Sequence, residues 1–202
     1  MNETNILADV PVMHIDANFS DMFNTQRALQ ARLNQQPTLF NLAHATIKAI
    51  YWSHCINAES VELLDWLEQQ DDTTWIKEMQ MEAIDIVHFI LNIAIEFKLT
   101  PKQIEAMELV YEHVEIEIDT ESVIDAVLLL NKQVIEFINL LPWKTWKTYK
   151  FEPDYLVLEL GYSKTIKAML LLCNACGLKR QDIINMYFAK NKVNHERQDN
   201  GY

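Results

Sequence analysis

The sequence has few of the residues that form turns, and it lacks long apolar runs. It has three glycines and five prolines in 202 residues, whereas an all-β domain of this length would need many more turn residues. Charges interrupt every apolar stretch before it reaches the roughly 18 to 20 residues that span a bilayer. Residues 1–11 carry acids and no basic cluster, so we expect no signal peptide there. The composition therefore predicts a mostly α-helical protein without membrane partners.

Basic residues and cysteines are also scarce. Seventeen basic against 29 acidic side chains give a net charge of −12, which argues against a nucleic-acid partner. A free nucleotide stays compatible with this charge, because a bound divalent metal can reverse the local sign. The three cysteines, Cys55, Cys173 and Cys176, include one CxxC pair in an apolar segment. Without a second pair or a nearby histidine, we expect core cysteines and a reducing cytoplasm rather than a zinc site.

Apolar periodicity divides the chain into helices. We expect them over about 17–36, 39–68, 75–98, 101–111, 121–141, 156–176 and 180–190. Asp16 or Ser20 is the expected cap of the first helix, and Gly177 separates the last two. Residues 112–120 alternate in polarity, which fits a strand, an acidic linker or a continued helix.

The organisation we predict is one all-α unit over residues 1–202. Core helices occupy about 17–100, an additional helical lobe about 101–141, and C-terminal helices with a tail 156–202. Residues 191–202 are too polar to build core, so another explanation of their composition is needed.

Two pairs of acids have the spacing that predicts chemistry. Glu59 and Glu62 share one helix face at i, i+3, and Glu82 and Asp85 repeat this on the next helix. A short connection predicts that the two helices pack antiparallel, which would bring the four carboxylates together. Two such charges 4 Å apart repel by about 4 kcal/mol at an effective dielectric of about 20. All-oxygen ligands favour Mg²⁺, or alternatively Mn²⁺, as the neutralising ion. Solvated surface acids are the alternative, which the apolar neighbours of the two pairs disfavour.

The segments around these acids resemble a known family. Residues 52–65, WSHCINAESVELLD, and residues 82–91, EAIDIVHFIL, resemble the all-α nucleoside triphosphate pyrophosphohydrolases, in particular the dimeric dUTPases and their tailed-phage relatives. The resemblance implies a helical bundle, with the ExxE and ExxD helices antiparallel around a metal site, and a homodimer. It also implies Mg²⁺-dependent hydrolysis of dUTP to dUMP and pyrophosphate, by attack at the β-phosphorus.

Three other functions stay open at this point. One is the house-cleaning hydrolysis of modified nucleotides, which the resemblance also covers but the C-terminal residues disfavour. Because the phage relatives include dCTPases, dCTP is an alternative substrate, alone or beside dUTP. A helical interaction protein that has lost catalysis is the alternative of another class.

Further stretches of the sequence imply substrate contacts. Residues 29–34, LQARLN, resemble the family segment whose amides face the pyrimidine base, here Gln30 and Asn34. An amide can both donate and accept hydrogen bonds, as a uracil edge requires; a polar helix face is the alternative. Trp52, the first residue of the resembling segment 52–65, is also expected to contact the substrate. His88 shares the face of Asp85, and the resemblance suggests a sugar or base contact, with a satisfied core histidine as the alternative.

The C-terminal residues 190–202, KNKVNHERQDNGY, resemble the dimeric dUTPase pattern KNxxNxxRQxxGY throughout. By this resemblance Lys190 and Arg197 neutralise the triphosphate, and Asn194 binds the sugar hydroxyl. The same pattern adds Gln198 and Tyr202 to the substrate-binding set. A charged tail without a ligand is the alternative reading.

Residues 143–147 resemble the family's WKxWK element, which implies that Lys144 and Lys147 touch phosphates. Relatives usually place this element between the two acidic helices, but here it follows Asp85 by about sixty residues. A partial duplication, with the element supplied by a second half or by the partner subunit, would account for the displacement. A surface turn with its tryptophans anchored in the core is the alternative.

Overall fold

The protein folds as an assembly of α-helices in the computed structural model, which describes residues 17–33, 42–70, 72–108, 118–144, 146–148 and 154–200. No strand occurs among these residues, so the predicted all-α class is confirmed. The helices are α1 (Phe19–Leu33), α2 (Leu42–Glu68), α3 (Trp75–Glu96), α4 (Pro101–Glu108), α5 (Thr120–Asn139), α6 (Tyr155–Ala175) and α7 (Arg180–Asp199). The alternating segment 112–120 lies largely outside the described residues, up to residue 117.

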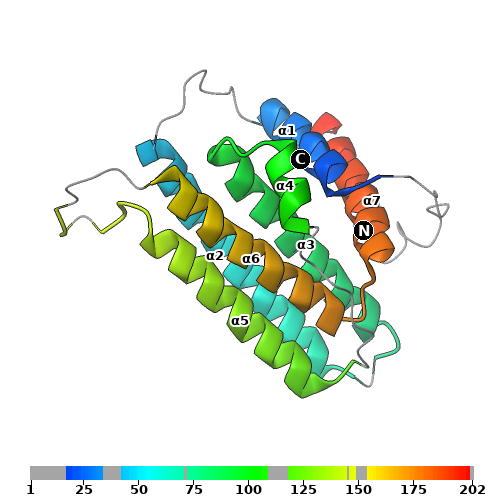
Figure 1. The fold of residues 1–202 in the computed structure, drawn as a ribbon. Helices are drawn as coiled ribbons and strands as arrows, with labels where there is room; N and C mark the ends of the chain where they lie inside the picture. Colours follow the sequence, from blue (N-terminus) through cyan, green and yellow to red (C-terminus); the bar gives the residue numbers. More distant parts are fainter. Residues whose placement is uncertain are drawn as a thin grey trace.

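The helices form two neighbouring groups (Figure 1). Helices α2, α5 and α6 run side by side, and α5 packs against both of the others. Helices α1 and α7 pack together on the other side of α3. Because α3 contacts α1, α2, α6 and α7, most of its residues are buried, among them Ile84, Val87, Ile90 and Leu91. Polar groups on α3 therefore lie close to the core.

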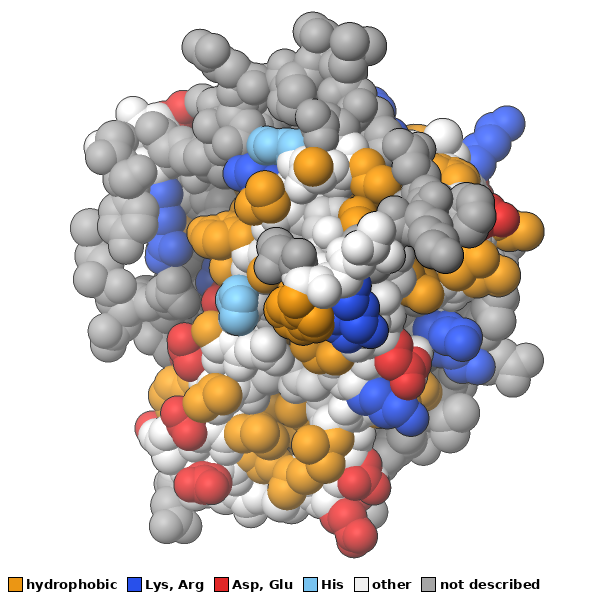
Figure 2. Space-filling view, turned by 90° about the vertical axis from the view of Figure 1, so that its left-hand side faces the viewer, with side chains coloured by type: hydrophobic (Ala, Val, Ile, Leu, Met, Phe, Trp, Pro, Cys, Tyr) orange, Lys and Arg blue, Asp and Glu red, His pale blue; other side chains and the backbone are white. Residues whose placement is uncertain are grey.

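One face of the molecule exposes apolar side chains. It lies where α2 and α6 begin and α5 ends, at the left of Figure 1, and Figure 2 shows hydrophobic side chains gathered in patches on it. The exposed apolar residues of these helix ends include Ile47, Tyr51, Ile135, Leu156 and Leu160. Exposed apolar patches of this kind mark interaction surfaces more often than single exposed residues do.

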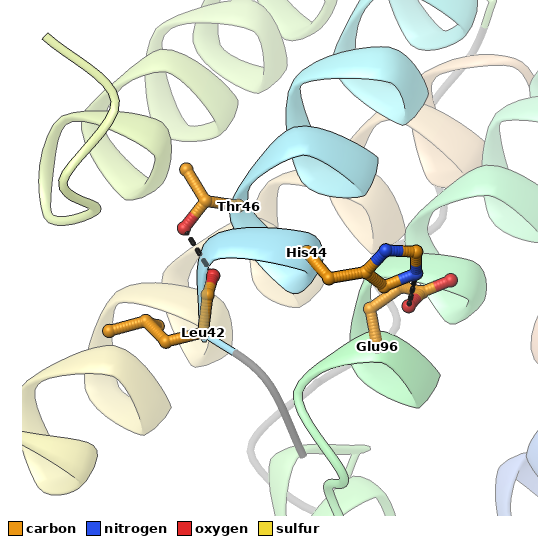
Figure 3. Close-up of polar contacts among 4 residues, drawn as sticks. All are labelled: Leu42, His44, Thr46 and Glu96. Atoms are coloured by element: carbon orange, nitrogen blue, oxygen red, sulfur yellow. Dashed lines mark hydrogen bonds and ion pairs between the residues drawn. The ribbon is translucent and has the colours of Figure 1, made fainter. Parts of the chain in front are cut away.

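Cross-helix contacts define the register of α2 against α3. His44 Nε2 lies 4.0 Å from Glu96 Oε2 (Figure 3). Farther along α2, Trp52 stacks on Phe89, with ring centroids 5.7 Å apart, and Glu59 hydrogen-bonds Glu82. Moving forward along α2 thus moves backward along α3, which confirms the predicted antiparallel pair.

Local signals explain most helix ends. Of the two expected caps of α1, Asp16 lies outside the described residues. Ser20 is wrong, because Asn18 takes this role: its Oδ1 accepts from the backbone N–H of Asp21 at 3.0 Å. Asp21 in turn accepts from the N–H of Asn18 at 2.9 Å, which is the reciprocal pattern of a capping box. At the end of α6, Gly177 has φ of 77°, a conformation that glycine adopts without strain.

The last helix is longer than the sequence predicted. A helix end near residue 190 is wrong, since α7 continues to Asp199. Lys190 and Asn191 are 7% and 3% exposed, so residues that we took as the start of a tail are part of a packed helix. Polar composition alone misled the prediction, because this polar face is buried against other polar groups. In the described part of the chain, no helix has the length and apolar character needed to cross a bilayer.

Candidate active site

A pocket of about 490 Å³ opens between α1, α2, α3 and α7. Helices α1, α2 and α3 contribute polar and apolar side chains, and α7 contributes polar and cationic side chains. The two ends of the pocket therefore differ in charge. Acids from α2 and α3 line one end, and amides from α1 and α3 line the other, near His88. The stacked rings of Trp52 and Phe89 also line the pocket.

Three of the four predicted acids converge. One carboxylate oxygen from each of Glu59, Glu82 and Asp85 lies within 4.8 Å of the other two. The antiparallel register brings Glu59 of α2 opposite the two acids of α3. Glu62 also lines the pocket, but it is exposed and lies outside this triad. The donors are hard carboxylate oxygens, which fits a divalent ion such as Mg²⁺.

The crowding of the acids changes their protonation. Burial raises the pKa of Glu82 to about 8, and the hydrogen bond with Glu59 and the charge of Asp85 act in the same direction. Burial and the charge of Asp85 also raise the pKa of Glu59. Glu82 therefore keeps its proton at neutral pH and donates it to Glu59. Burial is the larger cause, and the repulsion expected between neighbouring acids adds to it.

A cation from α7 reaches the same cluster. Lys190 Nζ lies 2.9 Å from Asp85 Oδ2, with both side chains largely buried. Asn194 and Arg197 follow Lys190 at helical spacing and line the pocket with it. One face of α7 therefore carries Lys190, Asn194 and Arg197, which were predicted to bind phosphate and sugar. Their i, i+4, i+7 spacing was the sequence signal for this arrangement.

The other predicted substrate contacts fall into two groups. Gln30 and Trp52 line the pocket, Gln30 being 5% exposed. Asn34 and Tyr202 lie outside the described residues, as does the side chain of Gln198.

The displaced lysines do not reach this pocket. Lys144 is half-buried, with Nζ 5.3 Å from the ring centroid of Trp143, and Lys147 is exposed. Neither is among the residues that line the pocket. Trp143 packs against the core while Trp146 is 71% exposed, so only one of the two tryptophans is anchored there.

A buried polar network beside His88 was missed by the sequence analysis. Gln26 of α1 contacts His88 and Asn92 of α3 and Tyr187 of α7, at 2.7 to 2.8 Å. Gln26 precedes Gln30 by one helical turn, and Asn92 follows His88 by one turn. This spacing was the available signal, but only the packing of three helices shows that these residues meet.

Comparison with known proteins identifies a family for this chain. A family model described as dUTPase matches residues 18–202. The match includes all seven described helices and every residue that lines the pocket. Neither a curated protein nor a solved structure matches the chain.

Proposed function

This chain belongs to the dUTPase family, and on that premise we propose that it hydrolyses dUTP to dUMP and pyrophosphate with Mg²⁺ as cofactor. Membership supports a nucleotide pyrophosphohydrolase of the dUTP or dCTP type in general. The observation that carries the finer proposal is the composition of the pocket. An acidic triad, a cationic helix face and stacked aromatic rings match the metal, the phosphates and the base of one nucleotide.

The acidic triad is the proposed metal site. Glu59, Glu82 and Asp85 would hold one or two Mg²⁺ ions, with Mn²⁺ as the alternative ion. Bound there, a divalent ion withdraws electron density from the phosphoryl group that is attacked and neutralises the charge that develops. Three carboxylates would not fill the coordination sphere of such an ion, so phosphate oxygens of the substrate could supply further ligands.

The remaining polar residues of the pocket position the substrate and water. Glu62 lies outside the triad and faces solvent, so it can accept a proton from the attacking water; Glu59 is the second candidate for this role. Arg197 and Lys190 offer charge to the phosphates, and Asn194 a hydrogen bond to the sugar. The amide of Gln30, with Asn34 beside it in sequence, reads the base edge, and Trp52 covers the ring face. Attack of water at the β-phosphorus would break the bond between this phosphorus and the α,β-bridging oxygen. dUMP would then be the leaving group, and the water oxygen would end up in pyrophosphate.

A homodimer is the proposed assembly. The apolar residues exposed where α2 and α6 begin and α5 ends provide a surface that a second copy can cover (Figure 2). Sedimentation analysis is expected to give about twice the mass of one chain. A monomer at micromolar concentration would contradict the dimer and leave the pocket chemistry unaffected.

The displaced lysines are proposed to act across this dimer. Lys144 and Lys147 do not line the pocket of their own chain, so a role in binding phosphate requires the partner subunit. Mixing a Lys144→Ala, Lys147→Ala chain with a Glu82→Gln chain should restore part of the activity that each lacks alone. Full activity of the Lys144→Ala, Lys147→Ala homodimer would remove the lysines from the site, and an inactive mixture of two inactive homodimers would refute their supply by the partner subunit.

The deciding experiment is pyrophosphate release measured side by side on dUTP, dCTP, dTTP and dATP, with Mg²⁺ present and absent. We expect Mg²⁺-dependent release with the highest kcat/KM on dUTP. A higher kcat/KM on dCTP would make dCTP the preferred substrate of the same reaction. Absence of release from all four would instead support a catalytically silent interaction protein.

A further inference from the structure

The amide end of the pocket contains a glutamine that is hydrogen-bonded on both sides. Gln26 is 2% exposed. Its Oε1 lies 2.8 Å from His88 Nδ1 and 2.8 Å from the hydroxyl of Tyr187, and 3.5 Å from Asn191 Nδ2. Its Nε2 donates to Asn92 Oδ1 at 2.7 Å. Because both ends of this carboxamide have partners, its orientation is constrained by two other helices, α3 and α7.

This orientation determines which nitrogen of His88 carries the proton. A carboxamide oxygen can only accept, so the contact at 2.8 Å requires that Nδ1 carries the hydrogen. The Tyr187 hydroxyl shares its single proton between Gln26 Oε1 and the carbonyl oxygen of Met22, 2.9 Å away. Burial also lowers the pKa of His88 to about 3, so the ring is neutral. Its Nε2 therefore has a free lone pair.

His88 is one of the residues that line the pocket. Its Nε2 is buried and meets no hydrogen-bond partner among the described residues. The ring is held by stacking on Tyr187, with centroids 4.3 Å apart, so it cannot turn freely. A buried acceptor without a partner costs free energy, which a ligand that donates to it would recover.

The position of His88 along α3 indicates which part of a nucleotide it meets. His88 lies one turn beyond Asp85, about 4.5 Å along the helix axis, on the side away from Glu82. Phe89, the next residue, stacks with Trp52. Phosphates held at the triad would therefore place the nucleoside, and not the phosphate chain, beside Nε2.

We propose that Gln26 is a positioning residue, which holds His88 in the Nδ1–H tautomer so that the Nε2 lone pair accepts a hydrogen bond from the nucleoside. The ligand must then supply an N–H or O–H donor at this point, either from the base or from the sugar hydroxyl. The identity of the ligand rests on the proposed function, but the tautomer does not.

The tautomer is tested by NMR on protein labelled with ¹⁵N in histidine, since a protonated and an unprotonated ring nitrogen differ in chemical shift. Because burial lowers the pKa of His88 to about 3, this residue stays neutral at mildly acidic pH and is identified by this. We expect the Nδ1–H form in the unchanged protein. The Nε2–H form would mean that the Gln26 carboxamide is turned the other way, and it would overturn the proposal.

Two variants separate positioning from folding. Gln26→Met keeps the size of the side chain and removes its hydrogen bonds, so His88 should lose the uniform Nδ1–H form. Gln181→Met, at an exposed site on α7, is the matched control and should leave the spectrum unchanged. An unaltered His88 spectrum in folded Gln26→Met would overturn the role of Gln26. If that variant fails to fold, the spectrum of the unchanged protein still decides the tautomer.

The ligand donor is tested with α,β-imido-dUTP and two analogues, one lacking the 3′-hydroxyl and one methylated at N3 of the base. Loss of one hydrogen bond should weaken binding to Gln26→Met by about 5- to 10-fold. The analogue that lacks the donor should bind the unchanged protein and Gln26→Met equally, which tells sugar from base. A full Gln26→Met effect with both analogues would overturn the proposed hydrogen bond. Absence of nucleotide hydrolysis with the predicted tautomer would instead reject the proposed function alone.

Discussion

The two ends of the pocket satisfy their polar groups in opposite ways. At the acidic end, Glu59, Glu82 and Asp85 crowd like charges that a proton and Lys190 only partly offset. At the amide end, Gln26 and the neutral groups around it pair with each other and are almost fully buried. The acidic end therefore carries electrostatic strain that a cation relieves, whereas the amide end stabilises the fold. The free energy of unfolding should therefore rise on substitution of Glu82 at the acidic end and fall on substitution of Tyr187 at the amide end.

The largest expected effect is the loss of turnover at the acidic end. Glu59→Gln, Glu82→Gln and Asp85→Asn should each lower kcat/KM on the order of a thousandfold, because each removes a metal ligand. Pyrophosphate release measures this, with helicity checked by circular dichroism. Glu68→Gln, exposed at the end of α2, is the control. A variant with more than about a tenth of the activity would remove its residue from the metal site.

Glu62→Gln sharpens this test. We expect it to abolish turnover as well, but through loss of the proton acceptor, so Mg²⁺ affinity measured by calorimetry should stay nearly unchanged. A parallel loss of metal affinity would make Glu62 a ligand.

The pH dependence of metal binding should be the next largest effect. With the pKa of Glu82 at about 8, a metal must displace its proton at neutral pH. Apparent affinity should therefore rise by up to about tenfold per pH unit below that pKa, and level off above it. Calorimetry in buffers of different ionisation enthalpy would count close to one released proton near neutral pH. Glu82→Gln should lose this dependence, and a flat profile in the unchanged protein would contradict the shared proton.

Stability of the metal-free protein should change in opposite directions within the triad. The pKa of Glu82 rises from 4.5 to about 8 on folding, so its contribution is complete below about pH 4.5 and is lost as pH rises through about 8. At neutral to alkaline pH, Glu82→Gln should therefore raise the free energy of unfolding, by about 1 to 2 kcal/mol after allowance for solvent screening.

Asp85→Asn should have the opposite effect on stability. It leaves buried Lys190 without its partner carboxylate, and we expect a loss of about 1 to 3 kcal/mol. Urea denaturation of both variants gives the comparison. If both substitutions changed the free energy of unfolding in the same direction, the view that only part of the acidic end is strained would be refuted.

The smallest effect is expected at the amide end. Tyr187→Phe removes the hydroxyl that bonds the Met22 carbonyl and Gln26, which should cost about 1 kcal/mol in free energy of unfolding. The control is Tyr155→Phe, at a half-exposed position on α6, where the change should stay within about 0.5 kcal/mol. If Tyr187→Phe were as stable as the control, the amide end would not be the rigid part of the pocket.

Prediction from the sequence succeeded where spacing within one helix was enough. The i, i+3 acids and the apolar rows indicated α2 and α3 and their antiparallel pairing. It failed for α7, where Asn191 is polar in sequence yet 3% exposed in the fold. Hydrophobic periodicity cannot predict a helix face that is buried against other polar groups, since the pattern shows no apolar side. The same limit hid Gln26 and Tyr187, which lie 161 residues apart in the chain.

The sequence alone determined the helical class, the acidic motifs and the family, because these depend on local spacing and on residue type. Only the tertiary structure decided that Glu62 lies outside the triad, that Lys190 pairs with Asp85, and that His88 Nδ1 meets Gln26. These outcomes depend on how helices distant in sequence pack against each other. Burial then changes the pKa values and the hydrogen bonds of residues such as Glu82 and His88, which nothing in the sequence distinguishes from exposed residues of the same type.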